Sequence, residues 1–166
     1  IGGVKTIEHG TYMSDATMEL MKKYNAYLVP TLTAGKEVAE KATVDGFYPE
    51  IVVPKALAVG PQIQETFAKA YKKGVGISFG TDAGVFEHGQ NGKEFGFMVA
   101  AGMPAMETIQ SATITNAILL QMEHKIGQIQ TGFFADIIAV DEGPTKNIST
   151  MENIVFVMKE GVVYKK

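Results

Sequence analysis

The sequence contains neither cysteine nor tryptophan among its 166 residues. The absence of cysteine excludes disulfide bonds, thiolate metal ligands and a cysteine nucleophile, so any bound metal must use histidine, carboxylate or water. Apolar residues never run on for the roughly 18 to 20 positions that a membrane-spanning helix needs. We therefore expect no membrane span, and any metal site should be built from nitrogen and oxygen ligands.

Charge of either sign is sparse and evenly mixed. The formal net charge is -3, from 15 Lys and Arg residues against 18 Asp and Glu residues. The chain has no basic stripe of the kind that follows phosphates, so we expect no nucleic-acid partner. Hydrophobic residues make up 46% of the sequence, which is typical of a globular protein that buries a core.

The first residue is Ile1, not methionine. We interpret this as a cut within a longer polypeptide. Any signal peptide would then lie upstream of the cut, so the sequence leaves the cellular compartment open.

Strand-like and helix-like segments alternate up to about residue 124. Strands are expected at residues 4–7, 27–32 and 75–79. Helices are expected at residues 14–24, 61–73, 94–101 and 104–122, with a long irregular connection over residues 33–60. Strands separated by helices predict a parallel α/β sheet with right-handed crossovers. Three such units fit part of an eight-stranded barrel or part of a doubly wound sheet, and periodicity alone does not choose between them.

The pattern changes after Lys125 to short strands separated by glycines. These are expected at residues 126–129, 135–140, 153–158 and 162–164, with a hairpin turn at 159–161. Residues 135–140 are almost continuously apolar, which is typical of a strand buried on both faces. We therefore place a boundary near His124 and expect one unit over residues 1–124 and another over 125–166.

Two polar residues follow predicted strands. His9 lies in the segment Thr-Ile-Glu-His-Gly, and Asp82 lies in Gly-Thr-Asp-Ala-Gly. Side chains at the carboxyl ends of parallel strands face a shared ligand-binding mouth in barrels and open sheets. Imidazole and carboxylate are ligands for zinc and similar ions. The simpler interpretation is that each side chain only hydrogen-bonds its neighbouring loop, and spacing alone does not exclude it.

Three separated segments together resemble the amidohydrolase superfamily, in particular its imidazolonepropionase-like and Xaa-Pro dipeptidase-like branch. They are residues 3–10 (GVKTIEHG), 77–84 (ISFGTDAG) and 127–140 (GQIQTGFFADIIAV). The resemblance runs along almost the whole chain. It implies the C-terminal part of a (β/α)8 TIM barrel, about strands six to eight, followed by part of a small β-sandwich.

The resemblance also implies chemistry. It places His9 after strand six as a metal ligand or as the group that polarises a carbonyl, and Asp82 after strand eight as metal ligand and catalytic proton shuttle. The implied cofactor is one or two divalent metal ions, zinc in the first instance. The implied reaction is hydrolysis of an amide or peptide C–N bond in a small molecule or peptide by a metal-activated water.

The family's other ligands, including its His-x-His pair, are absent from this chain. We therefore expect the isolated chain to be inactive and to need the upstream half of a barrel or a homo-oligomer partner. A barrel usually needs about 250 residues. The alternative hypothesis is a non-catalytic half-barrel module that docks on a partner chain. A nucleotide-binding domain is disfavoured because no glycine-rich phosphate loop follows a predicted strand.

Three further residues are candidate substrate contacts. His88 and Asn91 lie on the predicted loop after Asp82, and Thr31 lies at the end of the second predicted strand. Loops at strand ends often carry binding residues, although a solvated loop is an equally good interpretation of His88 and Asn91.

Overall fold

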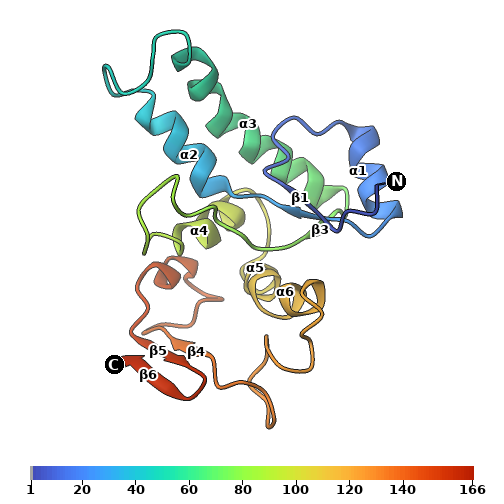
Figure 1. Cartoon of the computed structure of the whole chain (residues 1–166), viewed down its shortest axis with the longest axis vertical. Coiled ribbons are helices and arrows are strands. Elements are labelled where there is room, and N and C mark those ends of the chain that lie inside the picture. Colours follow the sequence, from blue (N-terminus) through green and yellow to red (C-terminus); the bar gives the residue numbers. More distant parts are fainter. Residues whose placement is uncertain (1) are drawn as a thin grey trace.

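A computed structural model describes residues 2–166 of the chain. Figure 1 shows two small sheets well separated from each other, with helices packed around the first and between the two. The N-terminal sheet contains β1 (Thr6–Glu8), β2 (Tyr27–Val29) and β3 (Gly76–Ile77). These strands lie in the order β1-β2-β3, and both pairs are parallel. The three strands predicted before residue 124 are therefore confirmed, although each is shorter than expected.

The first helix, α1 (Asp15–Lys23), follows the predicted signals. Ser14 is its N-cap, and the serine hydroxyl accepts a bond of 3.2 Å from the Thr17 backbone N–H. This bond satisfies one of the backbone groups that a helix start leaves without a partner. Asp15 pairs with Lys69 and Lys73 and so ties α1 to the end of a later helix.

Residues 33–60, expected to be irregular, are largely helical. They contain α2 (Leu32–Lys41) and the first part of α3 (Val53–Lys72), which pack side by side and project from the sheet (Figure 1). The prediction was wrong because two glycines that favour loops serve helix packing here. A Cβ atom on Gly35 would lie 2.7 Å from Ile63, and one on Gly60 would lie 2.8 Å from Ala39. The glycines therefore permit a close crossing of α2 and α3.

One hydrophobic cluster lies between the parallel sheet and its helices. Leu28 of β2, Met18 of α1 and Phe67 of α3 are at most 1% exposed. Burying side chains of this size contributes roughly 1.5–3 kcal/mol each. The core therefore holds the strands that carry His9 and Asp82.

Three helices follow β3: α4 (Lys93–Ala100), α5 (Ala105–Ala112) and α6 (Ile114–Leu119). A single helix was expected over residues 104–122, but it breaks at Thr113, whose φ and ψ are -120° and -89°. The Thr113 hydroxyl bonds the carbonyl of Ile109 one turn earlier. Such a bond competes with regular helix geometry, which a pattern of apolar residues does not reveal.

The C-terminal sheet contains β4 (Ile137–Ala139), β5 (Phe156–Lys159) and β6 (Val162–Lys165), paired antiparallel in that order. A 3-10 helix, η1 (Ile148–Glu152), precedes β5. The hairpin turn is confirmed, since Glu160 and Gly161 have φ of 50° and 81°. Residues 126–129 form no strand.

The expectation that residues 135–140 are buried on both faces was wrong. In β4, Ile138 is 51% exposed. The reason is that β4 is an outer strand of its sheet, and its apolar composition reflects a surface that the rest of the described chain does not cover. No helix within residues 2–166 is long and apolar enough to cross a membrane.

Candidate active site

The three parallel strands end at the same edge of their sheet, and a polar residue follows each of them. His9 comes directly after β1, Thr31 two residues after β2, and Asp82 after the chain that leaves β3. All three have left-handed backbones, with φ of 63°, 48° and 55°. This conformation is uncommon for residues other than glycine, and such strain concentrates at functional sites. The parallel register thus brings the two residues of the predicted metal site to one edge.

The orientation of the His9 ring is set by Thr31. His9 is exposed and its Nδ1 lies 2.6 Å from the Thr31 Oγ1, while the Thr31 hydroxyl donates to the Pro30 carbonyl at 2.8 Å. With the single hydroxyl hydrogen directed at the Pro30 carbonyl, Nδ1 is the donor in the bond between His9 and Thr31. The lone pair is then on Nε2, the form in which a second partner orients a metal-binding histidine.

The backbone around His9 is tightly constrained. The His9 N–H donates to the Val29 carbonyl at 2.9 Å, which continues the pairing of β1 with β2 by one residue. Gly10 follows with φ of 62°, and a Cβ atom there would lie 2.7 Å from the Leu28 side chain. Only glycine fits this turn without a shift, so the Glu-His-Gly segment places the imidazole at the strand end.

Hydrogen bonds and close packing hold the segment that leads to Asp82. Asn116 of α6 donates from its Nδ2 to the Phe79 carbonyl at 3.0 Å and bonds the Ser78 hydroxyl through its Oδ1. A Cβ atom at Gly80 would clash with the Val29 side chain, so the chain passes close over β2. The Asp82 carboxylate is exposed, and no group within residues 2–166 hydrogen-bonds it. A fixed backbone thus carries an open carboxylate.

The loop between β3 and α4 carries the other two candidates. The Asn91 Nδ2 donates to the Thr81 hydroxyl at 2.9 Å, and its Oδ1 accepts from the Gly89 N–H at 3.3 Å. His88 is exposed on the same loop. Asn91 therefore ties the loop to the residue before Asp82. Contact of His88, Asn91 or Thr31 with substrate stays a prediction.

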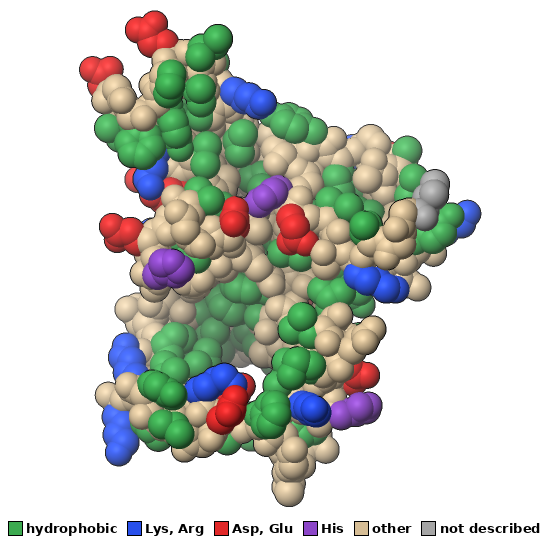
Figure 2. Space-filling view, in the orientation of Figure 1, with side chains coloured by type: hydrophobic (Ala, Val, Ile, Leu, Met, Phe, Trp, Pro, Cys, Tyr) green, Lys and Arg blue, Asp and Glu red, His purple; other side chains and the backbone are tan. Residues whose placement is uncertain are grey.

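The donors suit a divalent metal but are incomplete. A neutral imidazole with a free Nε2 and an open carboxylate match the ligands that zinc takes in proteins. Within the described part of the chain, however, no three His, Asp or Glu side chains are grouped so that they could hold an ion. Figure 2 shows histidine and acidic side chains across the middle of this face, above a hollow lined by hydrophobic ones. A metal site at His9 and Asp82 therefore stays a prediction.

Sequence reasoning missed the buried Glu94 in the first turn of α4. Its carboxylate is fully buried and accepts bonds from Leu32 N, Thr33 N and the Thr33 hydroxyl at 2.8, 2.7 and 2.6 Å. Burial raises the pKa of Glu94, and the three donors oppose that rise. A glutamate in a first helical turn usually faces solvent, so its position alone gave no signal of burial.

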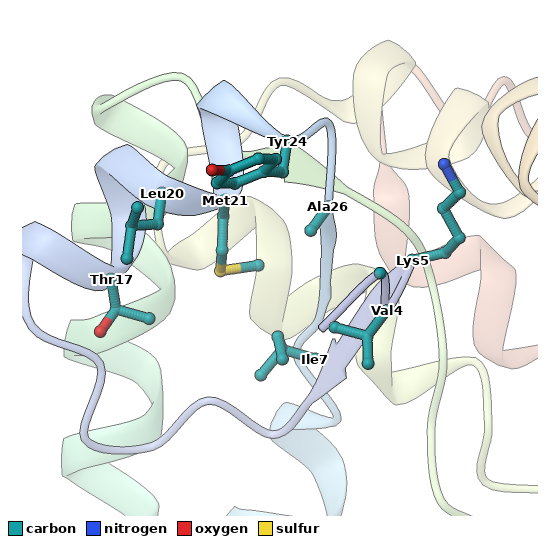
Figure 3. A pocket seen from close by; sticks show the side chains of 9 residues that line it. Val4, Lys5, Ile7, Thr17, Leu20, Met21, Tyr24 and Ala26 are labelled. Carbon is teal, nitrogen blue, oxygen red and sulfur yellow. The ribbon is translucent and has the colours of Figure 1, made fainter. Parts of the chain in front are cut away.

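An apolar groove of about 390 Å³ lies between β1 and α1 (Figure 3). Its lining includes Val4, Lys5, Tyr24 and Ala26, which come just before β1 and β2 begin. The groove is therefore at the opposite ends of the strands from His9 and Asp82. It is not part of the candidate site.

Comparison with known families matches residues 2–165 to the amidohydrolase family. The chain belongs to the amidohydrolase family. The predicted superfamily is thereby confirmed, and the structure corresponds to the C-terminal part of amidohydrolase barrels. The match extends over both the parallel and the antiparallel sheet.

Solved structures of related proteins agree. A Xaa-Pro dipeptidase with methionine bound in its active site is 55% identical, with a TM-score of 0.95 over 99% of this chain and 40% of its own. A prolidase complexed with N-methylphosphonate-L-proline is 28% identical, with a TM-score of 0.86 over 99% of this chain and 41% of its own. Both relatives are hydrolases by name, which confirms the expectation of an enzyme family.

The ochratoxinase of Aspergillus niger is similar as well. It is 29% identical over 168 residues, covering 98% of this chain and 34% of the ochratoxinase. The chain thus spans about a third to two fifths of the length of these relatives. The activities and substrates in the relatives' names are those of these longer proteins.

Proposed function

We propose that the chain supplies strands six to eight of a (β/α)8 barrel and part of a β-sandwich to a metal-dependent hydrolase of amide or peptide C–N bonds. Residues 1–124 belong to the barrel and residues 125–166 to the sandwich. The observation that carries the proposal is that His9 and Asp82 follow strands of one parallel sheet at the same edge, in a chain that matches the amidohydrolase family over residues 2–165.

Each residue has a defined role in this proposal. Asp82, whose carboxylate is open, takes a proton from the attacking water and returns it to the leaving nitrogen. His9 offers its Nε2 either as a metal ligand or as a hydrogen-bonding group toward the substrate carbonyl. Members of the family usually bind divalent metals, and one or two bound ions, zinc in the first instance, supply the Lewis acidity that makes water reactive at neutral pH.

The substrate class follows from the relatives only as a proposal. The dipeptidase and prolidase names point to dipeptides with a C-terminal proline, and the ochratoxinase shows that one fold serves different substrates. We propose a small amide or peptide, bound beside the loop of His88 and Asn91 and near Thr31.

The chain also needs a partner surface in this proposal. Strands β1 and β3 are the outer strands of a three-stranded parallel sheet, and each leaves one edge without a strand within residues 2–166. The edge of an outer strand is normally paired, covered or closed into a barrel. An upstream half-barrel, or a second copy of the chain, would cover these edges.

The test has two arms. In the first, the complete enzyme, with an upstream half-barrel present, is loaded with zinc and assayed against Xaa-Pro dipeptides and cyclic amides. Stoichiometric zinc uptake with hydrolysis is expected, and no metal uptake would rule the proposal out. In the second, the 166-residue chain alone is titrated calorimetrically with zinc. No tight site is expected, because His9 and Asp82 are two ligands where catalytic zinc usually has three.

A control for the second arm uses His88, which lies on the loop after Asp82 and is the nearest further imidazole in sequence. His88→Ala should leave the weak binding unchanged. One tight site per chain that disappears on mutation of His9 or Asp82 would show that the chain builds a complete site by itself.

A further inference from the structure

Glu94 is buried without an obvious need for a charge at its position. The side chain has no solvent-accessible surface, and its three hydrogen-bond donors all belong to the first two residues of α2. A buried carboxylate is costly unless it is fully hydrogen-bonded. Glu94 therefore serves the start of α2, which lies about 60 residues earlier in the chain.

The start of α2 needs an external cap. A helix start leaves backbone N–H groups without partners, and the N-cap side chain usually accepts one of them. Thr31 is the N-cap residue of α2, but its backbone is left-handed and its side chain makes no capping bond. Because Glu94 bonds Leu32 N and Thr33 N, the Thr31 hydroxyl is free for other partners.

The oxygen of the freed hydroxyl faces His9. Thr31 is 3% exposed, and its Oγ1 lies between the Pro30 carbonyl and the His9 Nδ1. A left-handed backbone is a true outlier for a β-branched residue, so neighbouring contacts must hold it in place. The carboxylate of Glu94 fixes the two residues that follow Thr31 and provides that restraint.

We propose that Glu94 is a positioning residue that acts through Thr31 to hold the His9 imidazole with its hydrogen on Nδ1 and its lone pair on Nε2. The bond made by one ring nitrogen decides which nitrogen can take a ligand. This assignment deepens the proposed function, on which the use of Nε2 rests. The tautomer itself is a property of the metal-free protein and can be measured there.

The test records the nitrogen NMR shifts of the His9 ring in metal-free protein, at a pH where imidazoles are neutral. His9 is assigned by the loss of its signals in His9→Gln. A pyrrole-type Nδ1 and a pyridine-type Nε2 are expected, opposite to the tautomer that free histidine prefers. His88 and His124 are exposed and provide references. A protonated Nε2 in His9 would overturn the proposal.

Two variants test the link from Thr31. Thr31→Val keeps the branched shape and removes the hydroxyl, so His9 should return to the free-histidine tautomer. Thr31→Ser restores the hydroxyl and should restore the tautomer. A purely structural role of Thr31 would give the reverse order, because valine keeps the packing better than serine. An unchanged His9 in Thr31→Val would overturn the proposal.

Glu94→Gln tests the origin of the restraint. Its amide would set an N–H group against the N–H of Leu32 or Thr33, so the His9 signals should shift toward the free tautomer. If this variant does not fold, Thr33→Val replaces it, because it removes one of the three bonds to Glu94. His9 signals identical to wild type in the variant that folds would overturn the role of Glu94.

Zinc affinity separates this inference from the proposed function. In the complete enzyme, Thr31→Val and Glu94→Gln should weaken zinc binding about 10- to 100-fold, the usual effect of losing a partner behind a ligand. If wild-type protein shows the expected tautomer but takes up no zinc, the proposed function fails and the positioning role stands. If zinc binds and the tautomer ignores both variants, the positioning role fails alone.

Discussion

The parallel sheet and the antiparallel sheet of this chain differ in how much surface they bury. Around the parallel sheet, Leu28 and Phe67 are at most 1% exposed. In the antiparallel sheet, every residue of β6 is exposed and Ile138 of β4 is 51% exposed. The candidate site is built on the region that packs its own core, whereas the second sheet leaves apolar side chains open to whatever completes it.

The surface between the two regions is also apolar and open. A groove of about 610 Å³ is lined by residues of α5 and α6 on one side and by β4 on the other. It includes Leu120 and Ile129, which are 61% and 87% exposed. The hollow in Figure 2, below the histidine and acidic side chains, is lined by hydrophobic ones in the same way. Among the helices and strands, the main contact between the regions is that of α4 with η1.

Matched phenylalanine variants should give the largest difference between the regions. Phe67→Ala removes a ring that is 1% exposed in the core and should cost about 3–5 kcal/mol of unfolding free energy. Phe134→Ala removes a ring that is 45% exposed and should cost less than about 1 kcal/mol. Urea unfolding followed by circular dichroism measures both. Equal losses would mean that the second sheet is as well supported as the first.

Asp82→Asn tests whether the chemistry belongs to the first region. The amide cannot accept the proton, so kcat of the complete enzyme should fall by more than about 10²-fold. The exposed side chain has no partner in residues 2–166, so the urea midpoint should not change. Near-native turnover in a zinc-loaded Asp82→Asn enzyme would remove Asp82 from its assigned role.

Sequence reasoning succeeded where the local signals are strong. Helices were expected to start at residue 14 and to end at residue 73, and they start at the Ser14 hydroxyl cap and end before Gly74, whose φ is 78°. The strand ends that carry His9 and Asp82 were found because apolar runs stop at glycine-containing segments. The family followed from three motifs, which hold more information than periodicity does.

Sequence reasoning failed where tertiary contacts override the local preference of a residue. Gly35 and Gly60 favour loops in isolation, but here they allow two helices to cross. Glu94 is indistinguishable in sequence from a solvated helix-start glutamate, and only the fold brings it to α2. The partner of His9 could not be predicted either. Thr31 reaches His9 because its own backbone is left-handed, a conformation that β-branched residues normally avoid.

Two glycines, Gly92 at the N-cap of α4 and Gly96 inside the helix, should show how tightly the regions are joined. A Cβ atom at Gly92 would lie 2.8 Å from the Glu152 Cα, so Gly92→Ala should push η1 away and cost about 1–3 kcal/mol. Gly96, in the same helix, has no atom within 4 Å of such a Cβ, and Gly96→Ala should stabilise the protein by about 0.5–1 kcal/mol. Thermal unfolding compares them. A tolerated Gly92→Ala would indicate that the contact of α4 with η1 yields easily.

The smallest effect is expected from Asp136, which holds the hairpin of the second sheet through surface bonds. Its carboxylate accepts from Lys159 Nζ at 2.9 Å and from the Glu160 N–H at 2.8 Å. The Lys159 ammonium, with the Glu160 N–H, keeps the pKa of Asp136 below its ordinary value. A carboxylate with a lowered folded-state pKa stabilises the protein above its unfolded pKa, and this stabilisation disappears as pH falls through the folded pKa.

The urea midpoint of the wild-type chain should therefore fall more steeply than that of Asp136→Asn once pH drops below the ordinary carboxyl pKa. The two midpoints should converge at the acid end, where the wild-type carboxyl is also uncharged. Because the pair is exposed, added salt should shrink the gap at neutral pH by screening the attraction. Parallel pH curves would show that the hairpin does not depend on this carboxylate, and that its turn residues, Glu160 and Gly161, suffice to hold β5 against β6.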